Sequence, residues 1–598
     1  MTQTLTEKTI ADLREFFNKK GTNPGDSLWW GISGLALSME EIIKSSLPPM
    51  PFVSCLDPGV GKTKSATHFI KNLLNSSDHK SIAVLYCVSR LNEVKALVED
   101  IGNGVGVLTG DRETNKLGTK EPFEARVLIT TQQLVDSRLS NVKRFADLSE
   151  FHYLGKPRLL KIWDESLLPA EALTLNIDSL RALPRSLVKV GFREQSILKG
   201  IRDVGKAIED KETDTKYAFP DLRLDYDYIM GFISEEKDTE LRKTARVLCL
   251  LQGKDVRVRR DNLSGNTVLD YQNTLPEDFF PVVILDASGR VRHTYHLWAK
   301  YRKNLLEIRG GTKTYDRLRI HLWNKGGGKA SWKRNSPILL DGVVSTINSK
   351  PEEKWLVILH KKDQPLWFDK KQKHIPDLEA EIKVRAAKPE NVRFLTWGNA
   401  HATNDYVDCT NVILAGTLFY PEAYYEATAR ASMGLSHDEK LDLDTYKDLE
   451  LGEHMHLILQ AACRGSVRLC EGDRAMPMNL YIIAKEQTGI TPTMLKTIFP
   501  GCDVMPWEPV AQEFRGDMRR VKEYLLANFK TPEQEILCKE ICASLDIAKS
   551  SNLNRILKDK RFEAFMKEAD IWFTSKNGQD HERKDRLIWK PGPAPILA

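Results

Sequence analysis

The chain has 598 residues, of which 41% are hydrophobic and 28% are charged. This composition is typical of globular proteins and excludes a disordered or fibrous chain. At about 150 residues per domain, the length predicts about four folded units. The formal net charge of +6 is small for this length, so it permits a nucleic-acid partner without requiring one.

Targeting signals and cysteine motifs are missing from the sequence. No apolar run approaches the roughly 18 residues that a membrane-spanning helix needs, and the charged, amphipathic N-terminus does not resemble an export signal. The nine cysteines are dispersed and include no CxxC pair. We therefore expect free thiols in a reducing cytoplasm, no membrane partner, and neither zinc nor iron–sulfur ligation.

The N-terminal third predicts one helical segment followed by a sheet domain. Residues 1–50 predict a charged helix and a loop that holds Trp29 and Trp30. In residues 51–169, short apolar runs alternate with amphipathic segments. This alternation predicts βαβ units and a parallel sheet that is buried on both faces.

The middle of the chain predicts an insertion and then a basic hairpin. Charged, leucine-spaced segments in residues 170–278 predict a mainly helical insertion, after which residues 279–300 complete the first domain with one more apolar strand. Residues 301–350 include RLRIHLWNKGGGKASWKR, which predicts a basic hairpin or linker that turns at Gly326–Gly328. Its tryptophans either stack on bases or pack beneath the turn.

The last part of the chain predicts a second sheet domain and a separate tail. A second strand-and-helix alternation fills residues 351–490, with its first strand at 355–360. Residues 510–598 predict a helix, a helix-turn-helix-like pair and two strands, which is the order of a winged helix. From Arg515 onward, 17 Lys and Arg stand against 13 Asp and Glu, so the basic excess is concentrated there.

A glycine-rich loop between a strand and a helix predicts a phosphate site. The run Asp57-Pro58-Gly59-Val60-Gly61-Lys62-Thr63 departs from GxxxxGK[ST] only at the first position, which is Leu56. Such a loop directs backbone N–H groups and a helix N-terminus at an anion. The expected nucleotide-binding residues are Asp57, Gly59, Gly61, Lys62 and Thr63, with Lys62 on the β- and γ-phosphates of ATP and Thr63 on Mg²⁺. The alternative is a chance glycine-rich turn.

A strand that ends in two carboxylates predicts the rest of an ATP hydrolase site. The apolar run at 159–163 leads into Asp164 and Glu165. Asp164 is expected to hold Mg²⁺, and Glu165 to orient or deprotonate the attacking water. The alternative is an acidic strand end that faces solvent.

With these motifs in place, the chain resembles superfamily-two helicases of the kind carried by phages and mobile elements. Four segments carry the resemblance in the family's order: residues 89–93 as motif Ia, 107–111, 128–134, and 285–288 as motif III. The resemblance implies that Ser89, Arg90, Thr130 and Thr131 contact nucleic acid. A Ser or Thr at a helix start is otherwise usually a cap.

The second domain resembles the family's motifs V and VI. Residues 397–416 look like motif V, in which Asn404 would hold phosphates, and residues 460–468 look like motif VI. The resemblance implies that Gln460 binds nucleotide and that Arg464 or Arg468 stabilises the charge of the transferred phosphoryl group, an effect worth about 10³–10⁵ in rate in related NTPases. Four residues apart, the two arginines are expected to share one helix face; the alternative is a salt-bridged surface helix.

The resemblance implies an α/β fold with two RecA-like P-loop domains, a helical insertion and a C-terminal winged-helix-like module. It also implies an ATP- and Mg²⁺-dependent helicase or translocase that acts on nucleic acid, DNA in preference to RNA, together with replication or recombination proteins. The expected setting is replication, recombination or mobile-element maintenance. Two alternatives stay open: a phage terminase-type DNA-packaging motor, and an ATP-switched nucleic-acid-binding protein without unwinding activity.

Overall fold

The protein is described here from a computed structural model and forms two compact units, Met1–Glu508 and Pro509–Ala598. The residues that the structure describes are 3–139, 142–233, 239–261, 265–362, 375–398, 405–509, 514, 516–531, 533–548, 550–559, 562–563, 565–566, 569–574 and 585–590.

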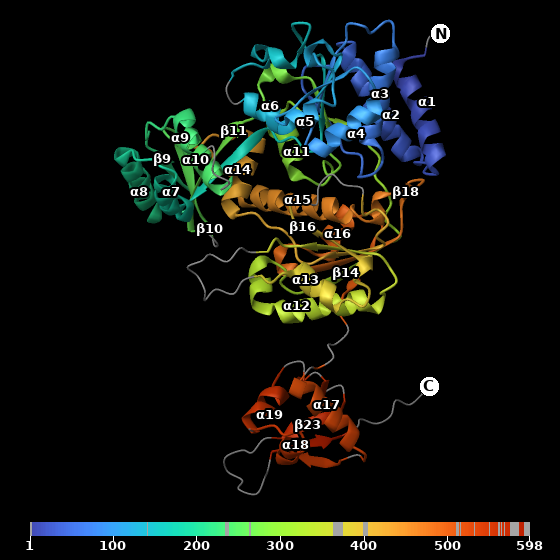
Figure 1. The fold of residues 1–598 in the computed structure, drawn as a ribbon, viewed down its shortest axis with the longest axis vertical. Helices are drawn as coiled ribbons and strands as arrows, with labels where there is room; N and C mark the ends of the chain where they lie inside the picture. The colour runs from blue at the N-terminus through green and yellow to red at the C-terminus, as the bar shows by residue number, and fades with distance from the viewer. Residues whose placement is uncertain are drawn as a thin grey trace. The chain divides into compact units, whose positions relative to one another are not determined.

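The first unit contains a seven-stranded sheet in the order β13-β1-β12-β7-β2-β4-β3, with every neighbouring pair parallel (Figure 1). Its strands are β1 (Pro51–Ser54), β2 (Val84–Val88), β3 (Val105–Leu108), β4 (Val127–Thr131), β7 (Leu160–Asp164), β12 (Val282–Leu285) and β13 (Leu306–Ile308). β1, β2, β4 and β12 are buried along their whole length, because helices and loops cover both faces. Because all the strands are parallel, their carboxyl ends lie at one edge of the sheet. The loops that follow the strands place polar groups at this edge.

Helices α3 (Lys62–Asn75) and α4 (Leu91–Ile101) pack on one face of this sheet, and α6 (Gln132–Leu139) packs on the other. Short elements complete the domain: α5 (Arg112–Asn115), the pair β5 (His152–Tyr153) and β6 (Lys156–Pro157), and α11 (His293–Leu297).

The N-terminal segment differs from the prediction of one helix and a loop. It forms two helices, α1 (Leu5–Lys20) and α2 (Asp26–Ile43), and Trp29 and Trp30 lie in the second. Trp29 is buried with Phe17 and Leu56, whereas Trp30 is 55% exposed. Helix α2 forms because its apolar residues recur at helical spacing and pack against the glycine-rich loop.

The insertion contains the expected helices and also a sheet that local sequence patterns did not predict. An antiparallel sheet in the order β8-β11-β10-β9 packs against four helices around one core. The elements are β8 (Ala170–Asn176), α7 (Ile177–Lys189), α8 (Gln195–Glu209), β9 (Thr215–Ala218), α9 (Tyr226–Ile233), α10 (Thr239–Leu251), β10 (Asp255–Asp261) and β11 (Gly265–Asn273). α14 (Glu422–Met433), which follows a strand of the second sheet, packs on β8 and β11 (Figure 1).

The second sheet has six strands in the order β16-β15-β17-β20-β14-β21, and all neighbouring pairs are parallel. The strands are β14 (Leu318–Asn324), β15 (Trp355–Leu359), β16 (Val392–Thr396), β17 (Asn411–Leu414), β20 (Met478–Ala484) and β21 (Asp503–Pro506). One face is covered by α12 (Lys329–Ser349) and α13 (Leu378–Arg385), the other by α15 (Leu443–Ala462) and α16 (Pro492–Ile498). The α/β class and the two parallel sheets are thus confirmed.

The predicted hairpin at 301–350 is wrong. The run LRIHLWN lies in β14, an interior strand that pairs with β20 and β21. The run KASWKR that follows the glycines begins helix α12. Gly326–Gly328 forms the loop between them rather than a hairpin turn. Trp332 is fully buried and donates its Nε1–H to the Ala415 carbonyl at 2.8 Å, so it is not available to stack on a base.

The unit Pro509–Ala598 has its own core and a three-stranded antiparallel sheet in the order β22-β24-β23. Its elements are α17 (Gly516–Asn528), β22 (Glu535–Leu537), α18 (Cys538–Ser544), α19 (Ser550–Leu557), β23 (Ile571–Thr574) and β24 (Arg586–Trp589). The short strand Glu535–Leu537 precedes α18 and was not among the predicted elements.

Within the described part of the chain, we find no helix whose length and hydropathy would let it cross a membrane.

Trp332→Ala tests the revised role of this segment. Removing a fully buried indole should destabilise the protein by about 3–5 kcal/mol, because the cavity cannot collapse completely. Trp30→Ala, at a side chain that is 55% exposed, is the control and should cost less than about 1 kcal/mol. Thermal unfolding measures both; equal midpoints for the two variants would contradict the burial of Trp332.

Candidate nucleotide and nucleic-acid sites

The glycine-rich loop connects β1 to α3 at the carboxyl edge of the first sheet. Gly59 and Gly61 have φ values of 81° and 105°, a left-handed region that glycine adopts without strain. A Cβ on Gly61 would lie 2.7 Å from the Phe17 ring, and a Cβ on Gly59 would overlap the carbonyl oxygen of Arg468. Both glycines are therefore required by close packing as well as by φ.

Lys62 lies at the start of α3 and is 8% exposed. Its ammonium donates to the carbonyl of Leu56, and to that of Asp57 at 3.3 Å. Burial lowers the pKa of Lys62 to about 8. An anion in the loop would therefore be stabilised by this ammonium, and would stabilise its charged form in return.

Asp164, at the end of β7, and Thr63 meet at the same point. The Asp164 carboxylate accepts from the Thr63 hydroxyl at 3.0 Å and from the Tyr86 hydroxyl at 3.0 Å. Burial raises the pKa of Asp164. A hydroxyl and a carboxylate this close are oxygen ligands that fit one Mg²⁺ beside bound phosphates.

Glu165 follows with a φ of 82°, which is uncommon for a residue with a side chain. Burial, together with the neighbouring carboxylates of Glu93 and Asp164, raises the pKa of Glu165 to about 7. Strained backbone of this kind is found mostly where a side chain must be held in one functional orientation. A carboxylate with a pKa near neutrality is also well suited to accept a proton from water.

Arg464 and Arg468 reach this edge from the second sheet domain, but they do not share a helix face as predicted. α15 ends at Ala462, and Arg468 ends the short 3₁₀ turn Ser466–Arg468. Arg464 is 1% exposed and donates to Gln460 Oε1 at 3.2 Å. Burial and the neighbouring Arg468 lower the pKa of Arg464 to about 10.

Arg468 is the arginine that reaches the glycine-rich loop. A Cβ built on Gly59 would lie 2.9 Å from Arg468 Cγ, so the first part of this side chain packs against the loop. Burial lowers the pKa of Arg468, and Glu165 and Asp164 act in the opposite direction through their negative charge. Gln460 lies beside Arg464 and accepts its hydrogen bond, and its contact with nucleotide stays a prediction.

The Asp57 side chain has partners within the protein, and the contact of this residue with nucleotide stays a prediction. Its side chain is fully buried, and each carboxylate oxygen has a donor. Oδ1 accepts from Arg290 Nε at 2.8 Å, and Oδ2 accepts from the backbone N–H of Lys313 at 2.8 Å. The carboxylate is therefore committed to the contact between the two sheet domains.

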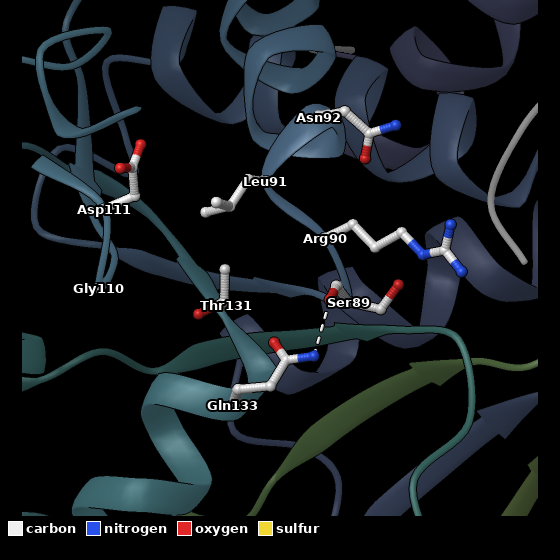
Figure 2. A pocket seen from close by; sticks show the side chains of 8 residues that line it. All are labelled: Ser89, Arg90, Leu91, Asn92, Gly110, Asp111, Thr131 and Gln133. Atoms are coloured by element: carbon white, nitrogen blue, oxygen red, sulfur yellow. Dashed lines mark hydrogen bonds between the residues drawn. The ribbon is translucent and has the colours of Figure 1, made fainter. Parts of the chain in front are cut away.

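A second site lies at the carboxyl ends of β2, β3 and β4 (Figure 2). It is an open cavity of about 670 Å³, and its lining residues are Ser89, Arg90, Leu91, Asn92, Gly110, Asp111, Thr131 and Gln133. Gln133 donates from Nε2 to the Ser89 carbonyl at 2.8 Å. The segments 89–93, 107–111 and 128–134, which carry the resemblance in the sequence, thus meet in one cavity.

The remaining predicted nucleic-acid residues divide three ways. Ser89, Arg90 and Thr131 line the cavity, whereas Thr130 is fully buried. Successive side chains of a strand point to opposite faces, so Thr130 and Thr131 cannot both face the same ligand. Asn404 lies outside the described residues.

Charged residues that sequence reasoning missed, Arg292, Glu453 and His456, connect the segment after β12 to α15. Asp286 accepts from the Ser288 hydroxyl at 2.6 Å, and the same hydroxyl contacts His456 Nδ1 at 2.5 Å. Arg292 forms a buried two-pronged ion pair with Glu453 at 2.7 and 2.8 Å. Spacing was an available signal: Glu453, His456 and Gln460 recur every three or four residues along α15.

Comparisons with known proteins find similarity only to solved structures. No protein-family model and no curated protein matches it. Among solved structures, it is similar to apo XPD (14% identity, 79% of this chain and 99% of that chain, TM-score 0.45). It is also similar to S. tokodaii Xpd4 (10%, 80% and 99%, TM-score 0.40) and to S. cerevisiae Dbp5 bound to RNA and ADP BeF3 (11%, 88% and 98%, TM-score 0.36).

Gly59→Ala tests the contact between the glycine-rich loop and Arg468. The new Cβ would overlap the Arg468 carbonyl, so the two segments must separate and the protein should lose thermal stability. Gly155→Ala is a matched control, because Gly155 has nearly the same φ (79°) and nothing within 4 Å of its Cβ position. Backbone strain alone costs each variant about 1–2 kcal/mol; a Gly59→Ala midpoint no lower than that of Gly155→Ala would disprove the contact.

Proposed function

We propose that the chain is an ATP-dependent nucleic-acid helicase or translocase of superfamily two. One observation carries the proposal: Arg468, from the second sheet domain, packs directly on Gly59 of the glycine-rich loop of the first. A nucleotide site built from two parallel-sheet domains lets hydrolysis change the contact between them. That change is what moves a motor along a strand.

In this proposal each residue has a role that its geometry supports. Lys62 and the loop N–H groups bind the phosphates of ATP. Thr63 and Asp164 hold Mg²⁺, which neutralises charge on the phosphate oxygens. Glu165 orients the attacking water and accepts its proton, and its pKa of about 7 suits that task.

The two arginines are proposed to act on different groups. Arg468 lies over the loop that cradles the phosphates, so its guanidinium is placed to stabilise charge on the transferred group. Arg464 is held by Gln460, and the carboxylate of Glu165 favours its charged form. We assign the finger role to Arg468 and the role of orienting Glu165 to Arg464.

The cavity at the ends of β2, β3 and β4 is proposed to bind the backbone of a single strand. Arg90 and the start of α4 offer a guanidinium and backbone N–H groups, which bind phosphates without regard to sequence. α6 links the two sites, because Gln132 donates to the Asp164 carbonyl at 2.6 Å and Gln133 to the Ser89 carbonyl at 2.8 Å.

Further proposals concern the unit Pro509–Ala598, the kind of nucleic acid, the location and the partners. The element order of Pro509–Ala598 supports a winged-helix module that binds DNA, and we propose DNA over RNA as the substrate. All nine cysteines are free, which supports a cytoplasmic location. We retain the phage or mobile-element type, with replication or recombination proteins as partners, on the order of the motifs alone.

Glu165→Gln tests the catalytic assignment. The amide cannot accept the water's proton, so ATP turnover should fall by at least about 100-fold while ATP binding stays within about threefold. Turnover is measured by phosphate release and binding with a fluorescent ATP analogue. Glu99→Gln, on the exposed face of α4, is the control and should hydrolyse ATP like the unaltered protein. Normal turnover by Glu165→Gln would remove Glu165 from the mechanism.

Nucleic acid should stimulate the ATPase, and Arg90→Ala should weaken that stimulation. Loss of one phosphate contact should reduce affinity about tenfold and lower the salt dependence by about one unit of slope. The assay uses single-stranded, duplex and forked DNA and RNA. Arg112→Ala, exposed on α5 and not lining the cavity, is the control. ATP turnover indifferent to every nucleic acid would favour the ATP-switched binding protein.

A further inference from the structure

The segment that joins the two sheets, residues 309–317, passes directly through the nucleotide site. It runs from β13 to β14 and carries Lys313, which is 1% exposed. The Lys313 ammonium donates to the carbonyls of Pro58 at 2.8 Å, Val467 at 2.8 Å and Arg468 at 3.0 Å. A lysine has three N–H donors, so all of them are used on carbonyls from opposite sides of the site.

Backbone contacts determine where Lys313 lies. The neighbouring Thr314 donates its N–H to the Asp473 carbonyl at 2.7 Å and accepts from the Ala475 N–H at 2.8 Å. On the other side, the Lys313 N–H donates to Asp57 Oδ2 at 2.8 Å. The linker is thus bonded to the second domain through one residue and to the glycine-rich loop through the next.

Arg290 is a second cation on the same carboxylate. Its Nε donates to Asp57 Oδ1 at 2.8 Å, and its other nitrogens donate to the carbonyls of Ile498 at 2.6 Å and Thr497 at 3.2 Å. These carbonyls lie at the end of α16, where helix carbonyls lack partners within the helix and favour a cation. Arg290 therefore connects the glycine-rich loop to α16. Lys313 connects the same loop to Val467 and Arg468.

We propose that Lys313 and Arg290, joined through Asp57, form a clamp that positions Arg468 over the phosphates. Lys313 is a positioning residue: it contacts the backbone of Val467 and Arg468 and leaves the Arg468 guanidinium to meet the substrate. This inference rests on the proposed function, since it concerns how Arg468 is placed in the ATP site. The proposal adds that Lys313, in the linker between the two sheet domains, keeps the second domain in contact with the glycine-rich loop. Neither Lys313 nor Arg290 belongs to the segments that resemble helicase motifs.

The clamp predicts a specific kinetic signature. Without the ammonium, the Pro58, Val467 and Arg468 carbonyls lose their shared donor, and Arg468 is no longer held at one distance from Gly59. The glycine-rich loop keeps its own contacts, so ATP should still bind. Lys313→Met should therefore lower kcat by about 100-fold, less than the roughly 10³–10⁵ expected for losing the arginine itself, with KM for ATP within about threefold.

The decisive experiment is a double-mutant cycle with Arg468→Ala. If Lys313 acts only through Arg468, Lys313→Met/Arg468→Ala should be no slower than Arg468→Ala alone. Lys206→Met, exposed on α8 of the insertion, is the control and should leave kcat unchanged. Single-variant losses that multiply in full, or a Lys313→Met variant within twofold of the unaltered protein, would overturn the clamp.

A second readout does not depend on hydrolysis. Amide hydrogen exchange should rise at least tenfold in peptides covering 56–63 and 464–472 of Lys313→Met, and should not change in Lys206→Met. Unchanged exchange would overturn the clamp whatever the activity, whereas an unaltered protein that hydrolyses no ATP would refute the proposed function alone. If Lys313→Met does not fold, Arg290→Gln provides the same test through exchange in 56–63 and 492–500; unchanged exchange there would likewise overturn the clamp.

Discussion

The structure depends on cationic groups that gather at the carboxyl edge of the first sheet, from the glycine-rich loop, the linker and the second sheet domain. Lys62, Lys313, Arg464 and Arg468 are held within a buried region, and burial lowers the pKa of each. Gathering cations out of water is costly unless negative charge accompanies them. Asp57, Asp164 and Glu165 supply part of that charge, and the phosphates of a nucleotide would supply the rest. The site is thus electrostatically suited to a polyanion.

Hydrogen bonds extend from this edge in two directions. α6 connects the Asp164 carbonyl to the Ser89 carbonyl through adjacent glutamines, and so joins the acidic pair to the cavity of Figure 2. The segment after β12 connects to α15 through Ser288 and His456, and α15 leads into Arg464. A nucleotide at the loop would therefore contact groups that are hydrogen-bonded both toward the cavity of Figure 2 and toward the second sheet domain. A chain of packed and hydrogen-bonded groups of this kind is one route by which two sites can be coupled.

Several predictions failed where pairing partners lie far apart in sequence. β14 pairs with β20 some 160 residues later, so its local pattern and the following glycines resembled a hairpin instead. β8 likewise pairs with β11 at Asn176↔Thr267, and the intervening helices concealed a sheet. The two arginines were expected on one helix, although Gly465 between them is a residue that weakens helices and marks where the regular structure ends.

The sequence by itself determined the local chemistry: a glycine-rich loop before a helix, an acidic strand end, and the alternation that builds parallel sheets. These are short-range patterns, and each is set by backbone geometry within a few residues. Tertiary structure alone decided which of Thr130 and Thr131 faces the cavity, that Asp57 serves the domain contact, and that Lys313 lies between Pro58 and Arg468. The reason is physical: a buried cation acquires its role from the carbonyls and carboxylates that surround it, and those come from segments hundreds of residues apart.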